Sequence, residues 1–289
     1  MIPTFKLHSD RAKFVPHTVP ELFFFAGGRT LNFDASREGG AIGHWHDEIE
    51  LILVEEGGMV YNVNGTRCAV NANEGIFVNA RQLHFFEESR CTYRCILLHP
   101  IMLCANTYLE ENYIAPVTQN GAFPYCVLKP ENEIAALFPA FFEAAAEKDL
   151  LRLQSLSYTL WGALLRLMPK NDAAPRENSR LSAVKDMMHE IQTRYAEKLT
   201  LEEVAAAGHV CKSACEKLFR TYLHCTPVEY LLRYRLQKAA ESLTQTDAAV
   251  AQIALDCGFS GASYFSGCFK TAYGCTPKAY RAAHKNGET

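Results

Sequence analysis

An internal repeat near the C-terminus constrains the fold more than any other feature of this sequence. Phe219-Arg220-Thr221 recurs fifty positions later as Phe269-Lys270-Thr271, and Cys225-Thr226-Pro227 recurs as Cys275-Thr276-Pro277. Each copy has the pattern of a short helix, a turn containing glycine and a second helix, which is the helix-turn-helix plan. The sequence therefore predicts two such units in tandem, with helices over about 201–207, 212–222, 249–256 and 262–273.

A Thr-Pro step follows each unit and starts a further helix. Thr226 and Thr276 each supply a capping hydroxyl immediately before a proline, which the first turn of a helix tolerates. The helix predicted over 227–243 would be about 25 Å long at 1.5 Å per residue. A rod of that length can hold the second helices of both units near the roughly 34 Å that separates successive major-groove faces. One chain could then contact two adjacent groove segments on one side of a duplex.

Residues 200–285 closely resemble the DNA-binding domain of AraC/XylS-type regulators. The matching positions are Ile253-Ala254, Gly258-Phe259-Ser260, Ser263-Tyr264-Phe265, Phe269-Lys270, Gly274, Thr276-Pro277 and Tyr280-Arg281. The resemblance implies sequence-specific binding to double-stranded promoter DNA by both units. By family analogy it also implies activation rather than repression, and a contact with RNA polymerase. The alternative from the residues alone is a helical repeat that contacts only proteins.

The outward positions of the second helices are the candidate DNA contacts. Helical spacing predicts a buried face in the first unit made of Ala214, Leu218, Phe219 and Tyr222. The outward residues of that unit are Lys212, Ser213, Glu216, Lys217 and Arg220. The rest of the predicted DNA-binding set is Ser263, Ser266, Lys270, Thr226, Thr276 and Arg281. Lysine can donate to guanine edges and glutamate can accept from cytosine, whereas Arg220 is better placed for phosphate.

Three positions depart from the family pattern. Gly267 stands where the family commonly has a long polar side chain, so we expect the second unit to contribute phosphate contacts and shape preference more than base identity. His209 occupies the usual position of the turn glycine, and the neighbouring Gly208 is expected to serve instead. Cys211 stands where a capping serine is usual.

The residues before the repeat indicate a different architecture. Between about 20 and 100, short β-rich runs alternate with turn residues, among them Asn64-Gly65, a strong hairpin signal. Two apolar stripes at helical spacing follow, over 134–142 and 150–167, which either cap a barrel or form a dimer interface. The predicted fold class is α+β with two domains. Its parts are a cupin-like antiparallel β-barrel over 1–130, a helical dimerisation segment over 131–168, a linker over 169–180, and an all-α double helix-turn-helix domain over 181–289.

A histidine-rich motif lies in the β-rich half. Alternation places His44, His46 and Glu50 on one face of a strand, and His84 ends a second β-rich run. If the two strands are neighbours, three imidazoles and a carboxylate converge inside the barrel, which is an acceptable ligand set for a divalent transition metal. The pattern resembles the two motifs of the cupin barrel, although Arg81 replaces a commonly found proline.

Three hypotheses account for this motif. It is the centre of a catalytic metal cupin, a sensory pocket that binds an effector with or without a metal, or a structural cluster of satisfied polar groups. The AraC resemblance favours the second hypothesis and implies a carbohydrate or related metabolite as effector. This interpretation requires no cofactor, and it leaves a divalent metal held by His44, His46, Glu50 and His84 as an option.

Charge divides along the chain in the way that DNA binding requires. The net charge is −3, but residues 1–175 carry 14 Lys and Arg against 20 Asp and Glu, whereas residues 176–289 carry 15 against 12. The cationic part coincides with the repeat, where phosphate contacts would lie.

The eleven cysteines form no Cys-x-x-Cys pair, and the N-terminus lacks a secretory pattern. We therefore expect a cytoplasmic bacterial protein with reduced thiols and no membrane partner, associated with the nucleoid when bound.

These features together predict a non-enzymatic, homodimeric transcription regulator that binds promoter DNA and responds to a small-molecule effector. The alternative is a metal-dependent cupin enzyme whose C-terminal helices are a partner-binding repeat. Retention of promoter DNA distinguishes the two.

Overall fold

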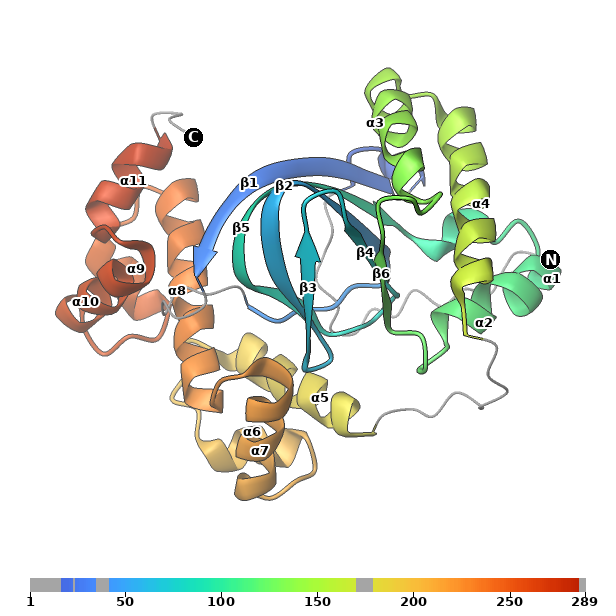
Figure 1. Ribbon diagram of the computed structural model, residues 1–289. Helices are drawn as coiled ribbons and strands as arrows, with labels where there is room; N and C mark the ends of the chain where they lie inside the picture. The colour runs from blue at the N-terminus through green and yellow to red at the C-terminus, as the bar shows by residue number, and fades with distance from the viewer. Residues whose placement is uncertain (1–16, 23, 35–41, 170–178, 286–289) are drawn as a thin grey trace. The chain divides into compact units, whose positions relative to one another are not determined.

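The computed structural model describes residues 17–22, 24–34, 42–169 and 179–285, and it divides into two compact domains (Figure 1). The N-terminal domain comprises Met1–Phe33 and His44–Asn178, and the C-terminal domain comprises Asp34–Gly43 and Ser179–Thr289. The predicted linker over 169–180 lies mostly outside the described residues, although its last two positions already belong to a helix.

The N-terminal domain is built on one curved antiparallel sheet of six strands. The strands are β1 (Phe24–Asp34), β2 (Ile49–Val63), β3 (Thr66–Asn71), β4 (Gly75–Val78), β5 (His84–Leu98) and β6 (Tyr125–Leu128). Their order is β1-β5-β2-β4-β6, with β3 also paired to β2. Strand β2 pairs with β5 along its whole length, from Ile49 opposite Leu98 to Val63 opposite His84. Asn64 and Gly65 join β2 to β3 with φ of 52° and 87°, the two left-handed residues of the predicted tight hairpin.

Alternation along β2 gives the sheet two different faces. Leu51 belongs to a core shared with the helices, whereas Ile52 belongs to a second core on the opposite face. Glu50 has the same parity as Ile52, so its side chain lies on the face away from the helices. This face holds the polar site described below.

Helices cover the other face. The main ones are α3 (Phe138–Glu147) and α4 (Leu150–Leu167), and shorter turns are η1 (Pro20–Leu22), η2 (Pro100–Leu103), α1 (Thr107–Leu109), η3 (Glu110–Ile114), α2 (Ala115–Thr118) and η4 (Ala135–Leu137). Phe141 and Leu160 are buried in one core with Leu51 of β2. Both apolar stripes therefore cap the sheet, and their assignment as the dimer contact is wrong for the buried residues, which are already packed inside their own domain.

Residues 179–285 of the C-terminal domain form helices joined by short connections, with no strand among them. Its helices are α5 (Ser179–Arg194), α6 (Leu201–Ala207), α7 (Lys212–Leu223), α8 (Pro227–Gln245), α9 (Val250–Asp256), α10 (Ala262–Tyr273) and α11 (Pro277–Lys285). Tyr230 in the first half of α8 packs edge-on against Phe219 of α7. Leu236 and Leu243 in its second half share a core with Phe265 of α10. The long helix thus supports one predicted unit at each end. Among the described helices, none has the length and apolarity needed to cross a membrane.

Candidate nucleic-acid interface and ligand site

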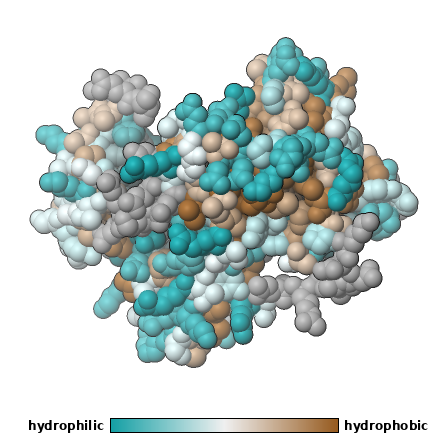
Figure 2. Space-filling model, viewed as in Figure 1, coloured by the Kyte–Doolittle hydropathy of each residue, from teal (hydrophilic) through white to brown (hydrophobic). Residues whose placement is uncertain are grey.

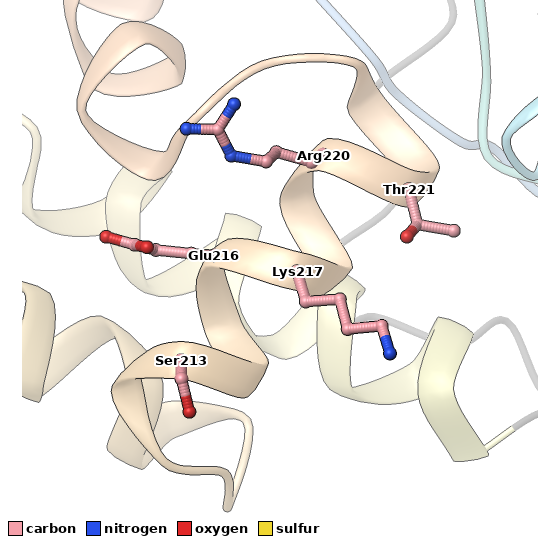
Figure 3. Close-up of a pocket in the computed structure, with 5 residues that line it drawn as sticks. All are labelled: Ser213, Glu216, Lys217, Arg220 and Thr221. Carbon is pink, nitrogen blue, oxygen red and sulfur yellow. The ribbon is translucent and has the colours of Figure 1, made fainter.

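The outward face of α7 is the most polar feature of the repeat. It carries a shallow depression lined by Ser213, Glu216, Lys217, Arg220 and Thr221 (Figure 3). All five side chains are exposed, as is Lys212 at the start of the helix. The five residues predicted to point outward therefore do so, and Thr221 extends the same face two turns beyond Ser213.

The inward face of α7 differs in detail from the prediction. Phe219 and Tyr222 are buried as expected, but Ala214 and Leu218 are only half-buried. Cys215 and Leu223 are buried in their place. Burial raises the pKa of the Cys215 thiol to about 11, so this cysteine behaves as a small apolar core residue.

One lysine of α7 is held in an ion pair with a neighbouring helix. Lys212 forms an ion pair with Glu202 of α6, and both side chains are more than half exposed. An exposed pair of this kind exchanges easily for a phosphate, because its net contribution to stability is small. In Figure 3, Lys217 and Glu216 leave the helix in different directions, so this donor and the acceptor lie on different sides of the depression.

The corresponding face of α10 has almost no charge. Ser263 and Lys270 are exposed and Ser266 is half-buried. A Cβ added at Gly267 would meet no atom within 4 Å, so packing does not require glycine there. Tyr264, which was not predicted as a contact, has 58% of its surface exposed. Its aromatic ring was overlooked because the family motif alone does not show which side of the helix it occupies.

Three residues of the predicted DNA-binding set have roles inside the fold. Thr226 caps α8 in a capping box with Glu229, and the Thr276 hydroxyl accepts a hydrogen bond from the amide of Ala279. The Arg281 guanidinium donates to the carbonyl of Ala248 at 2.6 Å. This hydrogen bond ties α11 to the loop before α9.

The turn of the first unit also corrects a prediction. His209 itself adopts the left-handed conformation with φ of 54°, whereas Gly208 has φ of −89°. Gly208 therefore does not replace the turn glycine. It is needed for a different reason, since a Cβ at this position would lie 2.7 Å from Cγ of Met187 in α5.

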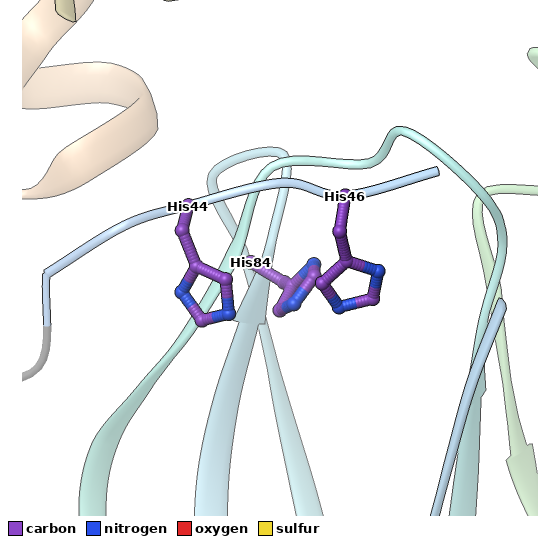
Figure 4. Close-up of side chains that lie close together, drawn as sticks. All are labelled: His44, His46 and His84. Carbon is purple, nitrogen blue, oxygen red and sulfur yellow. The ribbon is translucent and has the colours of Figure 1, made fainter. Parts of the chain in front are cut away.

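The histidines of the N-terminal domain converge as predicted. The ligand atoms of His44, His46 and His84 all lie within 4.8 Å of one another (Figure 4). His44 forms an isolated antiparallel bridge with His84, so the two segments are indeed neighbours. However, β2 begins only at Ile49, and the segment with His44 and His46 is not part of a regular strand. His46 and His84 are 2% and 1% exposed, which places the cluster in the interior.

Glu50 and Tyr61 complete the polar site. The Glu50 Oε2 atom lies 3.3 Å from Nε2 of His84 and accepts a hydrogen bond of 2.7 Å from the Tyr61 hydroxyl. The other carboxylate oxygen accepts from the thiol of Cys95 at 3.3 Å. Burial and the nearby carboxylate raise the pKa of Tyr61 well above its ordinary value, so the hydroxyl stays a donor. The hydrogen bonds from Tyr61 and Cys95 to Glu50 were not predicted, and no local sequence signal marks them.

Comparison with known proteins matches both domains. Residues 40–161 match the family model of the AraC-like ligand binding domain, and residues 204–283 match that of a helix-turn-helix domain. The chain is 30% identical over 251 residues to the uncharacterized HTH-type transcriptional regulator YdeC of Bacillus subtilis (strain 168), covering 82% of this chain and 85% of YdeC. It is 24% identical over 271 residues to the HTH-type transcriptional activator RhaS of Klebsiella pneumoniae (strain 342), covering 90% of this chain and 94% of RhaS.

The fold as a whole also has a solved counterpart. A crystal structure of apo ToxT from Vibrio cholerae strain SCE256 matches with a TM-score of 0.50 and 12% identity, covering 90% of this chain and 97% of ToxT. At that identity the likeness concerns the two-domain fold alone.

Proposed function

We propose, from the premise that the chain belongs to the AraC family of DNA-binding transcription regulators and has a ligand-binding domain, that it activates transcription in response to a hydroxyl-rich metabolite. The exposed charged face of α7 is the observation that carries this proposal. Activation is supported by the likeness to RhaS, a protein named as a transcriptional activator. A contact with RNA polymerase is proposed on the same analogy, and the site of action is the DNA of the bacterial cytoplasm.

The first unit supplies base recognition in this proposal. Lys217 has a flexible stem and three donors that suit the acceptors of a guanine edge, and Glu216 can accept from cytosine. Arg220 is one turn further along the same face and suits phosphate. The second unit contributes Lys270 and Ser263, which suit the sugar-phosphate backbone, so its part is mainly to fix position on the duplex.

The effector binds at the polar site of the N-terminal domain. His44, His46, His84 and Glu50 offer donors and acceptors within one small region, and Tyr61 adds an aromatic ring that stacks on His84 with centroids 5.9 Å apart. A buried set of convergent polar groups beside an aromatic ring suits a ligand rich in hydroxyl groups. Effector binding shifts the population between two arrangements of the domains, by as much as its affinities for them differ.

A homodimer would use the exposed side of α4, because its buried side packs in the core. Leu151 has 85% of its surface exposed and Tyr158 has 41%. Figure 2 shows apolar surface gathered over the region of α3 and α4.

We propose no catalytic role, since the relatives are regulators. A metal-dependent cupin enzyme is the alternative that the histidine cluster would permit.

Selection of genomic DNA fragments by the purified full chain tests the proposal. The expected result is retention of a few promoter fragments, with an affinity that falls roughly a thousandfold between 50 and 200 mM salt. Hydroxylated metabolites are then chosen from the reactions that the neighbouring genes encode. Transcription from a retained promoter should rise when the right metabolite is added. If no fragment were retained at low salt, the proposal that the chain regulates transcription would be wrong. If transcription fell when the metabolite was added, the proposal of activation would be wrong.

A further inference from the structure

We propose that Arg29 and Tyr93 form an anion-binding subsite beside the polar site of the N-terminal domain, and that the effector is a hydroxylated carboxylic acid of the sugar-acid class. This inference rests on the proposed function and deepens it, because it assigns a charge to the effector. The carboxylate of the effector would bind at Arg29, and its hydroxyl groups would bind at the polar site around Glu50 and His84.

Strand alternation places Arg29 on the face of the sheet that holds the polar site. Leu31, two positions further along β1, packs against the core on the face away from the helices, whereas Phe24 belongs to the core shared with the helices. Arg29 has the parity of Leu31, so its side chain lies on the face away from the helices. Its Nε donates to the hydroxyl of Tyr93 at 3.1 Å, and Tyr93 belongs to the core on that same face.

The partner of Arg29 differs from the partners of other arginines in the domain. Arg29 is exposed and donates to a phenol hydroxyl, and it forms no ion pair with any residue that the structure describes. A guanidinium has several N–H donors in a planar fork, so most of them are available to a ligand. Five other arginines each pair with a carboxylate: Arg67 with Glu87, Arg81 with Asp47, Arg94 with Glu55, Arg152 with Glu143, and Arg166 with Glu133. A carboxylate on the effector would give Arg29 the same kind of partner.

Tyr93 adds a second donor to the subsite. Its hydroxyl accepts the hydrogen bond from Arg29, and its own hydrogen has no acceptor among the described residues. Burial raises the pKa of Tyr93, so the hydroxyl keeps that hydrogen at neutral pH. A guanidinium beside a neutral hydroxyl suits a carboxylate, which accepts charge-assisted hydrogen bonds on both oxygens. A phosphate ester carries close to two negative charges, and one guanidinium would neutralise only part of them.

The subsite lies within reach of the polar site for one small molecule. Tyr93 and Cys95 are two positions apart on β5 and share a face, which sets them about 7 Å apart along the strand. The Cys95 thiol donates to Glu50, and Glu50 also accepts from Tyr61. A chain of about six carbon atoms, with bonds of about 1.5 Å, spans that distance. A sugar acid of this length could therefore place its carboxylate at Arg29 and its hydroxyl groups beside Glu50.

Calorimetric titration of the full chain with matched acids and neutral sugars tests the subsite. The acids are gluconate, glucuronate and galacturonate, the neutral sugars are glucose and galactose, and glucose 6-phosphate represents phosphate esters. We expect at least one acid to bind roughly tenfold or more tightly than its neutral counterpart.

Three variants locate the preference. Arg29→Gln should weaken binding of that acid roughly 10–100-fold and leave the affinity for the neutral sugar unchanged, because only the acid uses the guanidinium. Tyr93→Phe should weaken it about fivefold, through the loss of one hydrogen bond. Arg90→Gln is the matched control, since Arg90 is an exposed arginine of β5 with the parity opposite to that of Cys91, which belongs to the core on the face of the subsite. It should bind the acid as the wild type does.

The outcomes separate this subsite from the proposed function. Equal binding of acids and neutral sugars, or equal binding of the acid by wild type and Arg29→Gln, would overturn the anion subsite. Binding of none of the acids would overturn the sugar-acid class, and preference for glucose 6-phosphate would replace the carboxylate by a phosphate. Should Arg29→Gln fail to fold by circular dichroism, Arg29→Lys, which keeps the charge without the planar fork and should lose less affinity than Tyr93→Phe gains back with neutral sugars, is replaced as the deciding measurement by the wild-type preference and the loss in Tyr93→Phe. Promoter retention together with a transcriptional response to a neutral hydroxylated metabolite would leave the proposed function standing without the subsite.

Discussion

The two helix-turn-helix units share a backbone plan and differ in what they present to DNA. Helix α7 exposes Lys212, Glu216, Lys217 and Arg220, whereas Lys270 is the one lysine or arginine within α10. Gly267 leaves the middle of the α10 face open. The chemistry that can distinguish bases is therefore concentrated in the first unit, and the second is suited to backbone contacts.

In backbone conformation, the second unit is the better adapted of the two. Two turn positions adopt left-handed φ in both units, and they hold His209 and His224 in the first but Gly258 and Gly274 in the second. Glycine adopts this conformation without steric cost, whereas other residues lose about 1–2 kcal/mol there. The first unit thus combines the richer recognition surface with the more strained turns, and the second combines a plain surface with a relaxed backbone. In a tandem repeat, the copy with more polar side chains for recognition therefore need not be the copy whose residues best suit its turns.

The largest expected effect is on the turn of the second unit. Gly258→Ala should lower the free energy of unfolding by about 3 kcal/mol, because its φ is 78° and the new Cβ would lie 2.7 Å from the carbonyl oxygen of Ala196. Urea denaturation followed by circular dichroism measures the change. Gly267→Ala is the control and should raise stability by about 1 kcal/mol, since it sits in open space within a helix. Equal effects of the two substitutions would contradict the account of the turn.

The second effect concerns base recognition by the first unit. Lys217→Ala should weaken binding to the selected operator by about 1–3 kcal/mol and relax the preference at one or two base pairs, because it removes a donor to base edges. Fluorescence anisotropy with the operator and its single-base variants measures both quantities. A uniform loss across all variants would show that Lys217 contacts phosphate instead.

The matched substitution in the second unit should behave differently. Lys270→Ala should weaken binding to every sequence by a similar factor and reduce the slope of log affinity against log salt by about 1, as expected for the loss of one phosphate contact. The same anisotropy series at several salt concentrations measures the slope. A changed base preference would assign sequence recognition to α10 and remove the contrast between the units.

The smallest effect is a gain in stability at the strained turn. His209→Gly should raise the free energy of unfolding by about 0.5 kcal/mol, because relief of the left-handed strain slightly exceeds the entropy that glycine adds to the unfolded chain. His209→Asn should give an intermediate value, since asparagine tolerates this conformation better than histidine. Denaturation of the three proteins in one buffer checks the order. A loss of stability in His209→Gly would mean that the imidazole makes contacts that outweigh the strain.

Local patterns in the sequence predicted much of this fold. The repeat, the Thr-Pro steps and Asn64-Gly65 specify nearby residues, and their helices and hairpin were confirmed. Strand β6 was missed because four residues gain their strand pairing only by meeting β4, about fifty positions earlier in the chain. The role of Gly208 was misjudged for a similar reason, since it depends on Met187 in a helix outside the repeat.

The candidate sites could be predicted where helical or strand periodicity determines the side to which a side chain points. Spacing placed Lys217 and Arg220 outward and brought His44, His46 and His84 together, as the structure shows. It could not show that Arg281 reaches the carbonyl of Ala248, because that contact joins two separate helical segments. Cys95 was likewise invisible as a partner of Glu50, since only the register of β2 against β5 brings them together.

Selection of wild-type binding sites from a library of randomised operators tests the contrast between the units most directly. Repeating the selection with Lys217→Ala identifies the base pairs that belong to the first unit. We predict that base preference is concentrated in that segment and that the segment facing α10 shows little beyond a preference for deformable sequence. Equal preference in both segments, or preference confined to the one facing α10, would contradict the account.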